Sequence, residues 1–229
     1  MEFRPIAHIR SDFPEKFGIP RQSGLVEELS AAVVFEPEYR DPSAFRGLEG
    51  FSHLWLIWEF SRARREGWSP TVRPPRLGGN RRLGVFATRS PFRPNPIGLS
   101  CVRLVEARQD PELGPVLVVA GADLMDGTPI YDVKPYLPYA DCKPEARGGF
   151  AAQPKVASLE VDCSAELLAC VPQEKRAALL AVLAQDPRPQ YHSDPSRVYG
   201  MAFAGLEIRF RVDGNRLAVT EIGIPPAGS

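Results

Sequence analysis

The chain has 229 residues, of which 44% are hydrophobic and 24% are charged, and its 28 Lys and Arg side chains balance 28 Asp and Glu side chains. This length allows one domain, or one domain with a smaller second unit, and a core of real size. No apolar run reaches membrane-spanning length, and the N-terminal stretch MEFRPIAHIR lacks the apolar run of a signal peptide. We therefore expect neither a membrane protein nor a secreted one.

The cysteines agree with an intracellular location. Cys101, Cys142, Cys163 and Cys170 form no Cys-x-x-Cys pair, and no histidine lies near them in the sequence. We expect free thiols in a reducing cytoplasm and no metal site. The three histidines are scattered, without a partner at catalytic or metal-ligand spacing, so we interpret them as structural.

The first 147 residues predict a series of short strands. Apolar, β-branched and aromatic runs alternate with turn signals, and residues 41–45 predict a short helix with Asp41 as N-cap and Pro42 at its first position. This pattern favours a mainly β domain, an antiparallel barrel or a sandwich. The absence of a Gly-x-Gly-x-x-Gly fingerprint and of a Walker loop disfavours a Rossmann architecture. Strands are expected at residues 4–10, 31–35, 51–60, 83–88, 99–107, 115–120 and 128–133.

A change in composition at residues 147–154, which are rich in Gly and Ala, predicts a linker between domains at 1–147 and 155–229. The second domain is expected to be small and α/β. Its predicted helix at 173–184, opened by Pro172, is expected to turn a stripe of small and apolar residues toward the core. That stripe consists of Ala177, Leu180, Ala181 and Ala184. The other expected elements are a strand at 156–161, a short helix capped by Ser164, and a hairpin of strands 205–212 and 216–222 around Asp213-Gly214-Asn215.

Residues 89–98, RSPFRPNPIG, form the most informative segment of the chain. Three prolines stiffen the backbone and remove hydrogen-bond donors. A rigid loop that displays Arg89 and Arg93 is suited to bind a carboxylate or a phosphate, because little ordering entropy is lost on binding. A structural turn that carries charge by chance explains the same residues equally well.

The surrounding sequence has a strong local charge. Between residues 62 and 93 there are nine arginines and one acid, Glu66, and nine minus one gives +8. A run of arginine without lysine favours an anionic partner, most of all a nucleic acid. The alternative is a surface loop whose arginines pair with acidic residues elsewhere in the fold. Arg188 lies in a second proline-braced loop, which predicts either an RNA-contacting loop or a helix stop. The nine arginines are Arg62, Arg64, Arg65, Arg73, Arg76, Arg81, Arg82, Arg89 and Arg93.

Two acidic segments follow in the sequence. Asp123 and Asp126 lie on a turn, where they could bind a ribose or an ammonium group, although ordinary turn chemistry also explains them. In the next predicted strand Asp132, Lys134 and Tyr136 fall on one face, because side chains alternate along a strand. An acid, an amine and a phenol on one face are typical of a reaction site or of a paired-charge interface.

Taken together, several long segments resemble the TrmO (YaeB/VirR-type) family of tRNA methyltransferases. The match runs in order from residue 9 to about residue 140 and resumes weakly in the second domain. The segments that carry it are residues 9–11, 17–24, 46–55, 71–80, 84–98, 123–129, 132–136 and 185–189.

The resemblance implies an enzyme that uses S-adenosylmethionine to methylate N6 of threonylcarbamoyladenosine at position 37 of threonine tRNA, giving the m6t6A product. It also implies a single-sheeted β-barrel that binds this cofactor without a Rossmann unit, and a homodimer. The resemblance implies that Arg89 binds the carboxylate of the cofactor's methionine part, and that Asp123 or Asp126 binds its ribose or its amino group. The implied cofactor residues are Pro20, Arg21, Gln22, Ser61, Arg62, Arg89, Leu99, Asp123, Leu124, Met125 and Asp126.

Within this hypothesis Asp132 or Tyr136 accepts the proton of the amine, and Lys134 orients a group or binds phosphate. Asn95, in a segment similar to the Asn-Pro-Pro-aromatic motif of Rossmann N6-adenine methyltransferases but without its aromatic, is a further candidate to bind the reacting nitrogen. Two alternatives remain: a non-catalytic RNA-binding β-barrel and an S-adenosylmethionine-binding regulator. The residues expected to contact tRNA are Arg73, Arg76, Arg81, Arg82, Arg93 and Arg188.

Overall fold

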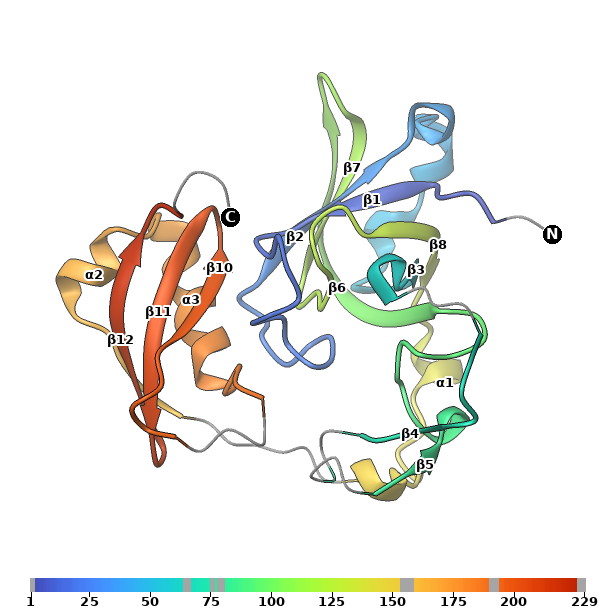
Figure 1. The fold of residues 1–229 in the computed structure, drawn as a ribbon. Helices are drawn as coiled ribbons and strands as arrows, with labels where there is room; N and C mark the ends of the chain where they lie inside the picture. Colours follow the sequence, from blue (N-terminus) through green and yellow to red (C-terminus); the bar gives the residue numbers. More distant parts are fainter. Residues whose placement is uncertain are drawn as a thin grey trace.

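The computed structural model describes residues 3–63, 67–74, 77, 81–152, 159–189 and 194–225. Its first part is a closed barrel of six antiparallel strands in the order β1-β2-β7-β6-β3-β8, which confirms the barrel and rules out the sandwich (Figure 1). The barrel strands are β1 (Ala7–Arg10), β2 (Ser30–Phe35), β3 (His53–Glu59), β6 (Ile97–Asp110), β7 (Gly114–Ala120) and β8 (Pro129–Pro135).

The barrel core follows from alternation along the strands. In β3, Leu54, Leu56 and Trp58 are buried, while His53, Trp55 and Ile57 between them are only partly buried. Because closure pairs both edges of the sheet, no barrel edge is left to associate with other chains. The interior holds mainly branched aliphatic side chains, among them Ile9, Val33, Leu54, Leu56, Val102, Leu117, Val119 and Ile130.

The connections contain short 3-10 helices and a small ribbon. Asp41 caps one 3-10 helix through Ser43 N at 2.9 Å, as the sequence predicts. The predicted strand at 83–88 is wrong beyond residue 84, because the Val85 carbonyl accepts hydrogen bonds from Thr88 N and Oγ1 and closes a turn. The ribbon is β4 (Thr71–Val72) with β5 (Leu83–Gly84), and the 3-10 helices are Pro37–Tyr39, Pro42–Phe45, Leu48–Gly50, Ser61–Ala63, Val85–Ala87 and Gly149–Ala151.

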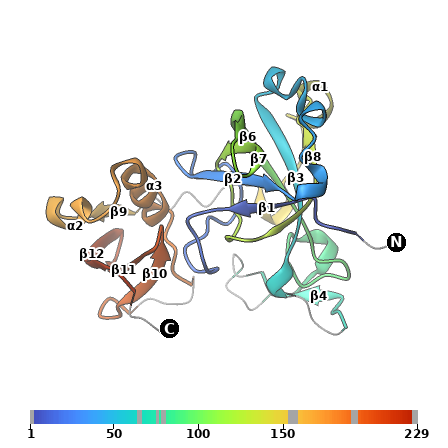
Figure 2. The ribbon, with the colours of Figure 1, turned by 90° about the horizontal axis from the view of Figure 1, so that it is seen from above.

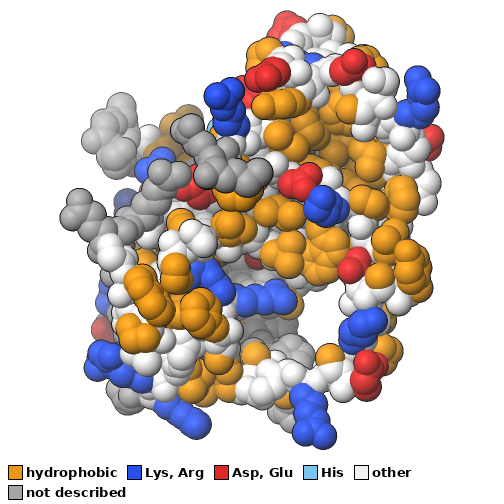
Figure 3. Space-filling view, turned by 90° about the vertical axis from the view of Figure 1, so that its right-hand side faces the viewer, with side chains coloured by type: hydrophobic (Ala, Val, Ile, Leu, Met, Phe, Trp, Pro, Cys, Tyr) orange, Lys and Arg blue, Asp and Glu red, His pale blue; other side chains and the backbone are white. Residues whose placement is uncertain are grey.

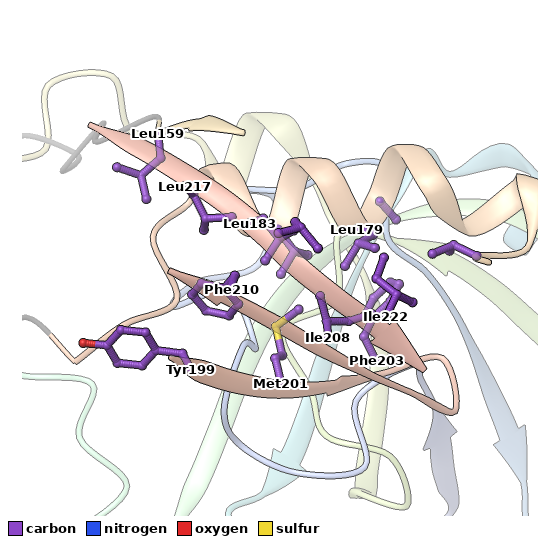
Figure 4. Close-up of a cluster of buried hydrophobic side chains, with 14 of the residues drawn as sticks. Leu159, Leu179, Leu183, Tyr199, Met201, Phe203, Ile208, Phe210, Leu217 and Ile222 are labelled. Atoms are coloured by element: carbon purple, nitrogen blue, oxygen red, sulfur yellow. The ribbon is translucent and has the colours of Figure 1, made fainter. Parts of the chain in front are cut away.

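The second part is a four-stranded sheet in the order β10-β11-β12-β9, with α3 packed on one face (Figure 4). The predicted hairpin is confirmed, with Gly214 at a φ of 56° in its turn, and Ser164 caps α2. The sequence did not predict β10, and residues 156–158 of the predicted strand 156–161 lie outside the described residues. The elements are α1 (Pro138–Asp141), β9 (Glu160–Asp162), α2 (Ala165–Ala169), α3 (Gln173–Ala184), β10 (Tyr199–Phe203), β11 (Leu206–Asp213) and β12 (Arg216–Gly223).

Helix α3 has the predicted bounds, but the predicted face is wrong. Ala177 is exposed, and Leu180, Ala181 and Ala184 are only partly buried. The helix turns Leu179, Val182 and Leu183 to the sheet, and these three side chains bury more apolar area than the mostly alanine stripe would. The buried residues are Ala178, Leu179, Val182 and Leu183.

The loop between β1 and β2 joins the two parts of the molecule (Figure 2). Its Phe13, Val26 and Leu29 belong to the core of the second sheet rather than to the barrel core. Asp12 pairs with Lys175 of α3 at 2.7 Å, and its carbonyl accepts from Ala204 N at 2.8 Å. The second domain therefore fixes the path of residues 19–22, which lie in the middle of this loop.

Among the described residues no helix is long and apolar enough to cross a membrane. Within the same residues, no three His, Cys, Asp or Glu side chains come together as a metal site would require. All four cysteines are free thiols.

Candidate active site

A cavity of about 650 Å³ opens where β3 ends and β6 begins. This is the size range of small-molecule sites. Its walls come from segments that are far apart in sequence and meet only in the fold. They are residues 19–22 of the β1–β2 loop, 58–63 at the end of β3, Thr88, Arg89, Pro91, Arg93 and Asn95 of the proline-rich loop, 97–99 of β6, and Lys16, Asp123, Met125 and Thr128.

The inner wall of the cavity carries a polar chain on an otherwise apolar barrel face. Trp58 Nε1 donates to Ser100 Oγ at 2.9 Å, and Ser100 Oγ donates to Asp123 Oδ1 at 2.5 Å. Ser100 is fully buried at an inward position of β6. Gly98 faces Trp58 across the β3–β6 pair, and a Cβ there would stand 2.3 Å from the indole ring. Gly98 therefore makes the space that the tryptophan occupies.

Asp123 is the electrostatic centre of this wall. Burial raises the pKa of its carboxyl, although Ser100, backbone N–H groups including that of Ser23, and the nearby Arg89 act in the opposite direction. A partly buried carboxylate whose lost hydration is only partly replaced is costly in a folded protein, and such acids are concentrated at binding sites. A ligand that brings hydroxyl or ammonium hydrogens to Asp123 would remove that cost.

Arginines and amides line the rim of the cavity. Arg89 Nη1 donates to Gln22 Oε1 at 2.5 Å, which ties the proline-rich loop to the β1–β2 loop. Lys16 Nζ donates to the carbonyl of Arg62 at 3.4 Å and ties the same loop to the end of β3. Arg21, Arg62 and Arg89 are exposed, so their guanidinium groups are available to an anionic part of a ligand.

The structure brings most of the predicted cofactor residues to this one cavity. Leu124 and Asp126 are the two that do not line it. Leu124 is 1% exposed inside the barrel core, and Asp126 Oδ1 accepts from Ser11 N at 3.0 Å. The nine that line it are Pro20, Arg21, Gln22, Ser61, Arg62, Arg89, Leu99, Asp123 and Met125.

The predicted catalytic residues lie elsewhere, on the outer face of the barrel. Asp132 pairs with Ile57, which in turn pairs with Leu99. Two strand spacings separate Asp132 from Leu99, roughly 10 Å, and neither Asp132 nor Lys134 lines the cavity. Lys134 Nζ lies 2.8 Å from Asp132 Oδ2 in a half-exposed ion pair.

Tyr136 directly follows the last residue of β8, with its ring 5.8 Å from that of Trp55 and 6.2 Å from that of His53. Burial, followed by the neighbouring Cys142, Cys101 and Asp141, raises the pKa of its phenol. The hydroxyl therefore stays protonated at neutral pH, so Tyr136 can donate or accept a hydrogen bond, but the phenolate that would take up a proton is scarcely populated.

The predicted RNA-contacting arginines fall into two groups. Arg73, Arg81 and Arg82 are exposed around the β4–β5 ribbon, whereas Arg76 lies outside the described residues. Arg93 braces the proline-rich loop by donating from Nη1 to the Thr88 carbonyl at 3.2 Å. Arg188 is 13% exposed and forms a two-point ion pair with Asp186, at 2.8 and 3.1 Å, which competes with any phosphate.

Sequence reasoning missed Trp58, Glu59 and Ser100. The only signal for Ser100 is a polar residue at an inward position of an alternating strand, and that signal depends on knowing which face is inward. Glu59 is 6% exposed and accepts a hydrogen bond from the Tyr131 hydroxyl, across two strands that the sequence does not pair by itself.

Known proteins resemble this chain over nearly its whole length. A tRNA (adenine(37)-N6)-methyltransferase of Escherichia coli K12 is 44% identical over 219 residues, covering 92% of this chain and 93% of that protein. A protein of the same name from Eikenella corrodens is 51% identical over 164 residues, covering 71% and 92%. The crystal structure of TrmO from Pseudomonas aeruginosa has a TM-score of 0.78 at 34% identity, covering 97% of this chain and 98% of that one.

Two family models together match most of the chain. Residues 8–142 match the tRNA-methyltransferase O N-terminal domain, and residues 156–224 match the TrmO C-terminal domain. With the closed barrel and the cavity at its end, this places the protein in a family whose fold has no Rossmann unit. The chain belongs to the tRNA-methyltransferase O family.

Proposed function

We propose that this protein is an S-adenosylmethionine-dependent enzyme that methylates N6 of the adenine at position 37 of tRNA. Its relatives from Escherichia coli and Eikenella corrodens bear the name of that activity. A protein from Pseudomonas aeruginosa, 43% identical, is named as a putative S-adenosylmethionine-dependent methyltransferase. The observation that carries the proposal is the cavity in which the partly buried Asp123 faces a rim of arginines.

The chemistry of this cavity fits S-adenosylmethionine. Asp123 offers a carboxylate to the ribose hydroxyls or to the ammonium group, and Arg89 or Arg21 offers a guanidinium to the carboxylate. Trp58 and Leu99 supply apolar wall. The cofactor supplies a methyl group on a sulfonium, which is already activated. The residues of the chain therefore have to hold the two reactants in line, and positioning alone contributes on the order of 7–11 kcal/mol to such reactions.

We further propose that the acceptor is threonylcarbamoyladenosine of threonine tRNA and the product m6t6A. The threonylcarbamoyl group adds a carboxylate to the base. Arginine on a stiff loop is a suitable partner for that carboxylate, because its planar fork binds carboxylates at two points. Arg73, Arg81 and Arg82 on the ribbon are our candidates for the phosphates of the anticodon arm.

Asp132 remains our candidate to accept the amine proton, with Lys134 and Tyr136 beside it. Because these residues do not line the cofactor cavity of their own chain, we propose that they act at the cavity of a second copy of the chain. Leu99 and Val105 expose about half of their surface on that side of β6. On the side of the molecule that Figure 3 faces, hydrophobic side chains gather in the middle, as a self-association surface requires. We therefore propose a homodimer in the cytoplasm that completes each site with residues from both copies.

Transfer to defined tRNA tests the activity. Purified protein with labelled S-adenosylmethionine should methylate threonine tRNA that carries threonylcarbamoyladenosine and leave unmodified threonine tRNA unlabelled. A modified tRNA with guanine at position 37 is the control for position. Cofactor binding without transfer would support a regulator, and RNA binding without cofactor binding would support a non-catalytic module.

Complementation tests the shared site. Asp123→Asn and Asp132→Asn proteins should each be inactive alone, because one lacks the cofactor contact and the other the proton acceptor. After the two variants exchange subunits, half of the dimers contain one copy of each variant. Each of these dimers has one intact site of two, so activity should return to about a quarter of wild type. Mixtures that stay inactive, or an Asp132→Asn protein with full turnover, would remove this assignment.

A further inference from the structure

A second cavity, of about 770 Å³, adjoins the cofactor cavity. The two share lining residues at the end of β3 and in the proline-rich loop, which form the boundary between them. A small molecule in one cavity can therefore touch a molecule in the other. The shared residues are Glu59, Ala63, Arg93, Asn95 and Ile97.

Four aromatic side chains, from Phe3, Trp68, Phe92 and Tyr131, are among the residues that line the second cavity. Trp68 and Phe92 line it and expose 54% and 39% of their surface, and the ring of Phe3 lies 5.7 Å from that of Tyr131. Indole and phenyl rings left in contact with solvent lose the burial that would otherwise stabilise them, and they are typical of surfaces on which planar ligands stack. Nucleobases are the planar groups that RNA offers.

The boundary between the cavities carries the polar groups. Glu59 is nearly buried, and one of its carboxylate oxygens accepts a hydrogen bond from the Tyr131 hydroxyl. A carboxylate has about four lone-pair positions, so Glu59 can accept a further bond from an amine N–H. Asn95 is on the same boundary and offers an amide oxygen. The carboxylate of Glu59 matches the exocyclic amine of adenine rather than a carbonyl, and Asn95 can accept from the same amine through its amide oxygen.

We propose that the second cavity holds the target adenine of the RNA, stacked on Trp68, with its amino nitrogen beside Glu59 at the boundary. This inference rests on the proposed function and adds the location of the acceptor. A base inside an anticodon loop must leave its neighbours to reach such a cavity. Arg93 lies on the same boundary, where its remaining guanidinium donors can bind the carboxylate of a substituent on that amine.

A double-mutant cycle between protein and RNA tests the stacking. The probes are two anticodon stem-loops of threonine tRNA, one with adenine at position 37 and one with an abasic site there. Wild-type protein should bind the abasic RNA about tenfold more weakly, since one base–aromatic stack is lost. Trp68→Ala should bind the adenine RNA as weakly as the wild type binds the abasic RNA. Its affinities for the adenine RNA and for the abasic RNA should agree within about twofold, because the tryptophan and the base contribute through the same contact.

Phe86→Ala is the matched control. Phe86 is 73% exposed and its ring lies 6.0 Å from that of Trp68, but it lines neither cavity. This variant should distinguish the two RNAs as wild type does, and Trp68→Phe should keep most of the difference because a ring remains. Additive losses in Trp68→Ala, or equal effects of the two alanine variants, would overturn the proposal.

Titration with S-adenosylmethionine separates this inference from the proposed function. Trp68→Ala should bind the cofactor within about twofold of wild type. If it loses the cofactor instead, the second cavity is part of the cofactor site and the inference fails. Wild-type protein that binds no cofactor but still distinguishes the two RNAs would overturn the proposed function and leave the base site standing.

Discussion

Asp123→Asn is expected to weaken cofactor binding strongly while leaving the protein folded and more stable than wild type at neutral pH. The carboxylate accepts from Ser100 and faces the cavity with its pKa raised by burial. An asparagine keeps the shape but removes the charge that would meet the ammonium group or the ribose. Cofactor affinity should fall by about 100-fold, since loss of one partner of a buried charged pair costs roughly 2–5 kcal/mol.

The same substitution should change how stability depends on pH. Below the ordinary pKa of an aspartate, the carboxyl is protonated in the folded and in the unfolded state, so no charge is buried on folding. As the pH rises from that value through the raised pKa of the folded state, the unfolded chain ionises first, and the wild type loses stability. The variant has no carboxyl group at this position and keeps its stability. The difference in stability between variant and wild type should therefore grow across this pH range and persist above it. Wild-type cofactor affinity should change in the opposite sense, weakening as the pH falls through the raised pKa.

Calorimetric titration with S-adenosylmethionine and thermal unfolding across pH measure both effects. Asp126→Asn is the matched control, because Asp126 lies on the same turn, holds Ser11 N and does not line the cavity. It should keep cofactor affinity and lose stability slightly. An Asp123→Asn protein that binds the cofactor as wild type does would contradict this view of the site.

The sequence predicted correctly those features that depend on residues close together in the chain. Asp41 and Ser164 cap their helices as expected, and α3 has the predicted bounds, because caps and helix starts depend on a few neighbouring residues. The buried face of α3 was wrong because it is decided by the sheet it packs on. Strand β10, YGMAF, was missed because glycine and alanine weaken its local strand signal, whereas pairing with β11 along its whole length creates it.

In the site, too, features that depend on nearby residues could be predicted, and features that depend on strand pairing could not. Nine of the cofactor residues implied by the family resemblance line the cavity, but the polar chain from Trp58 through Ser100 to Asp123 needs the register of β3 against β6. The anchoring of the β1–β2 loop was also beyond sequence reasoning. Gly18, at a φ of 93°, is so close to Met201 that a Cβ would stand 2.2 Å from its sulfur, a contact between residues 183 positions apart.

Gly98→Ala should disrupt the cavity from within the barrel. The new Cβ would stand 2.3–2.6 Å from three atoms of the Trp58 indole, and that ring is fixed by its bond to Ser100 and by the ring of Phe60, 4.3 Å away. Overpacking of this kind costs about 1–3 kcal/mol. We expect a fall in melting temperature of roughly 2–4 °C for each kcal/mol, together with loss of cofactor binding as the indole leaves Ser100.

A second substitution separates the steric effect from the hydrogen bond. In Gly98→Ala with Trp58→Leu the smaller side chain makes room for the methyl group, so most of the stability should return. Cofactor affinity should not return, because leucine cannot donate to Ser100 and the chain to Asp123 stays broken. Gly84→Ala, where a Cβ meets no atom within 4 Å, controls for adding a methyl group to a strand. Recovery of affinity together with stability would show that the tryptophan fills space and does not position Asp123.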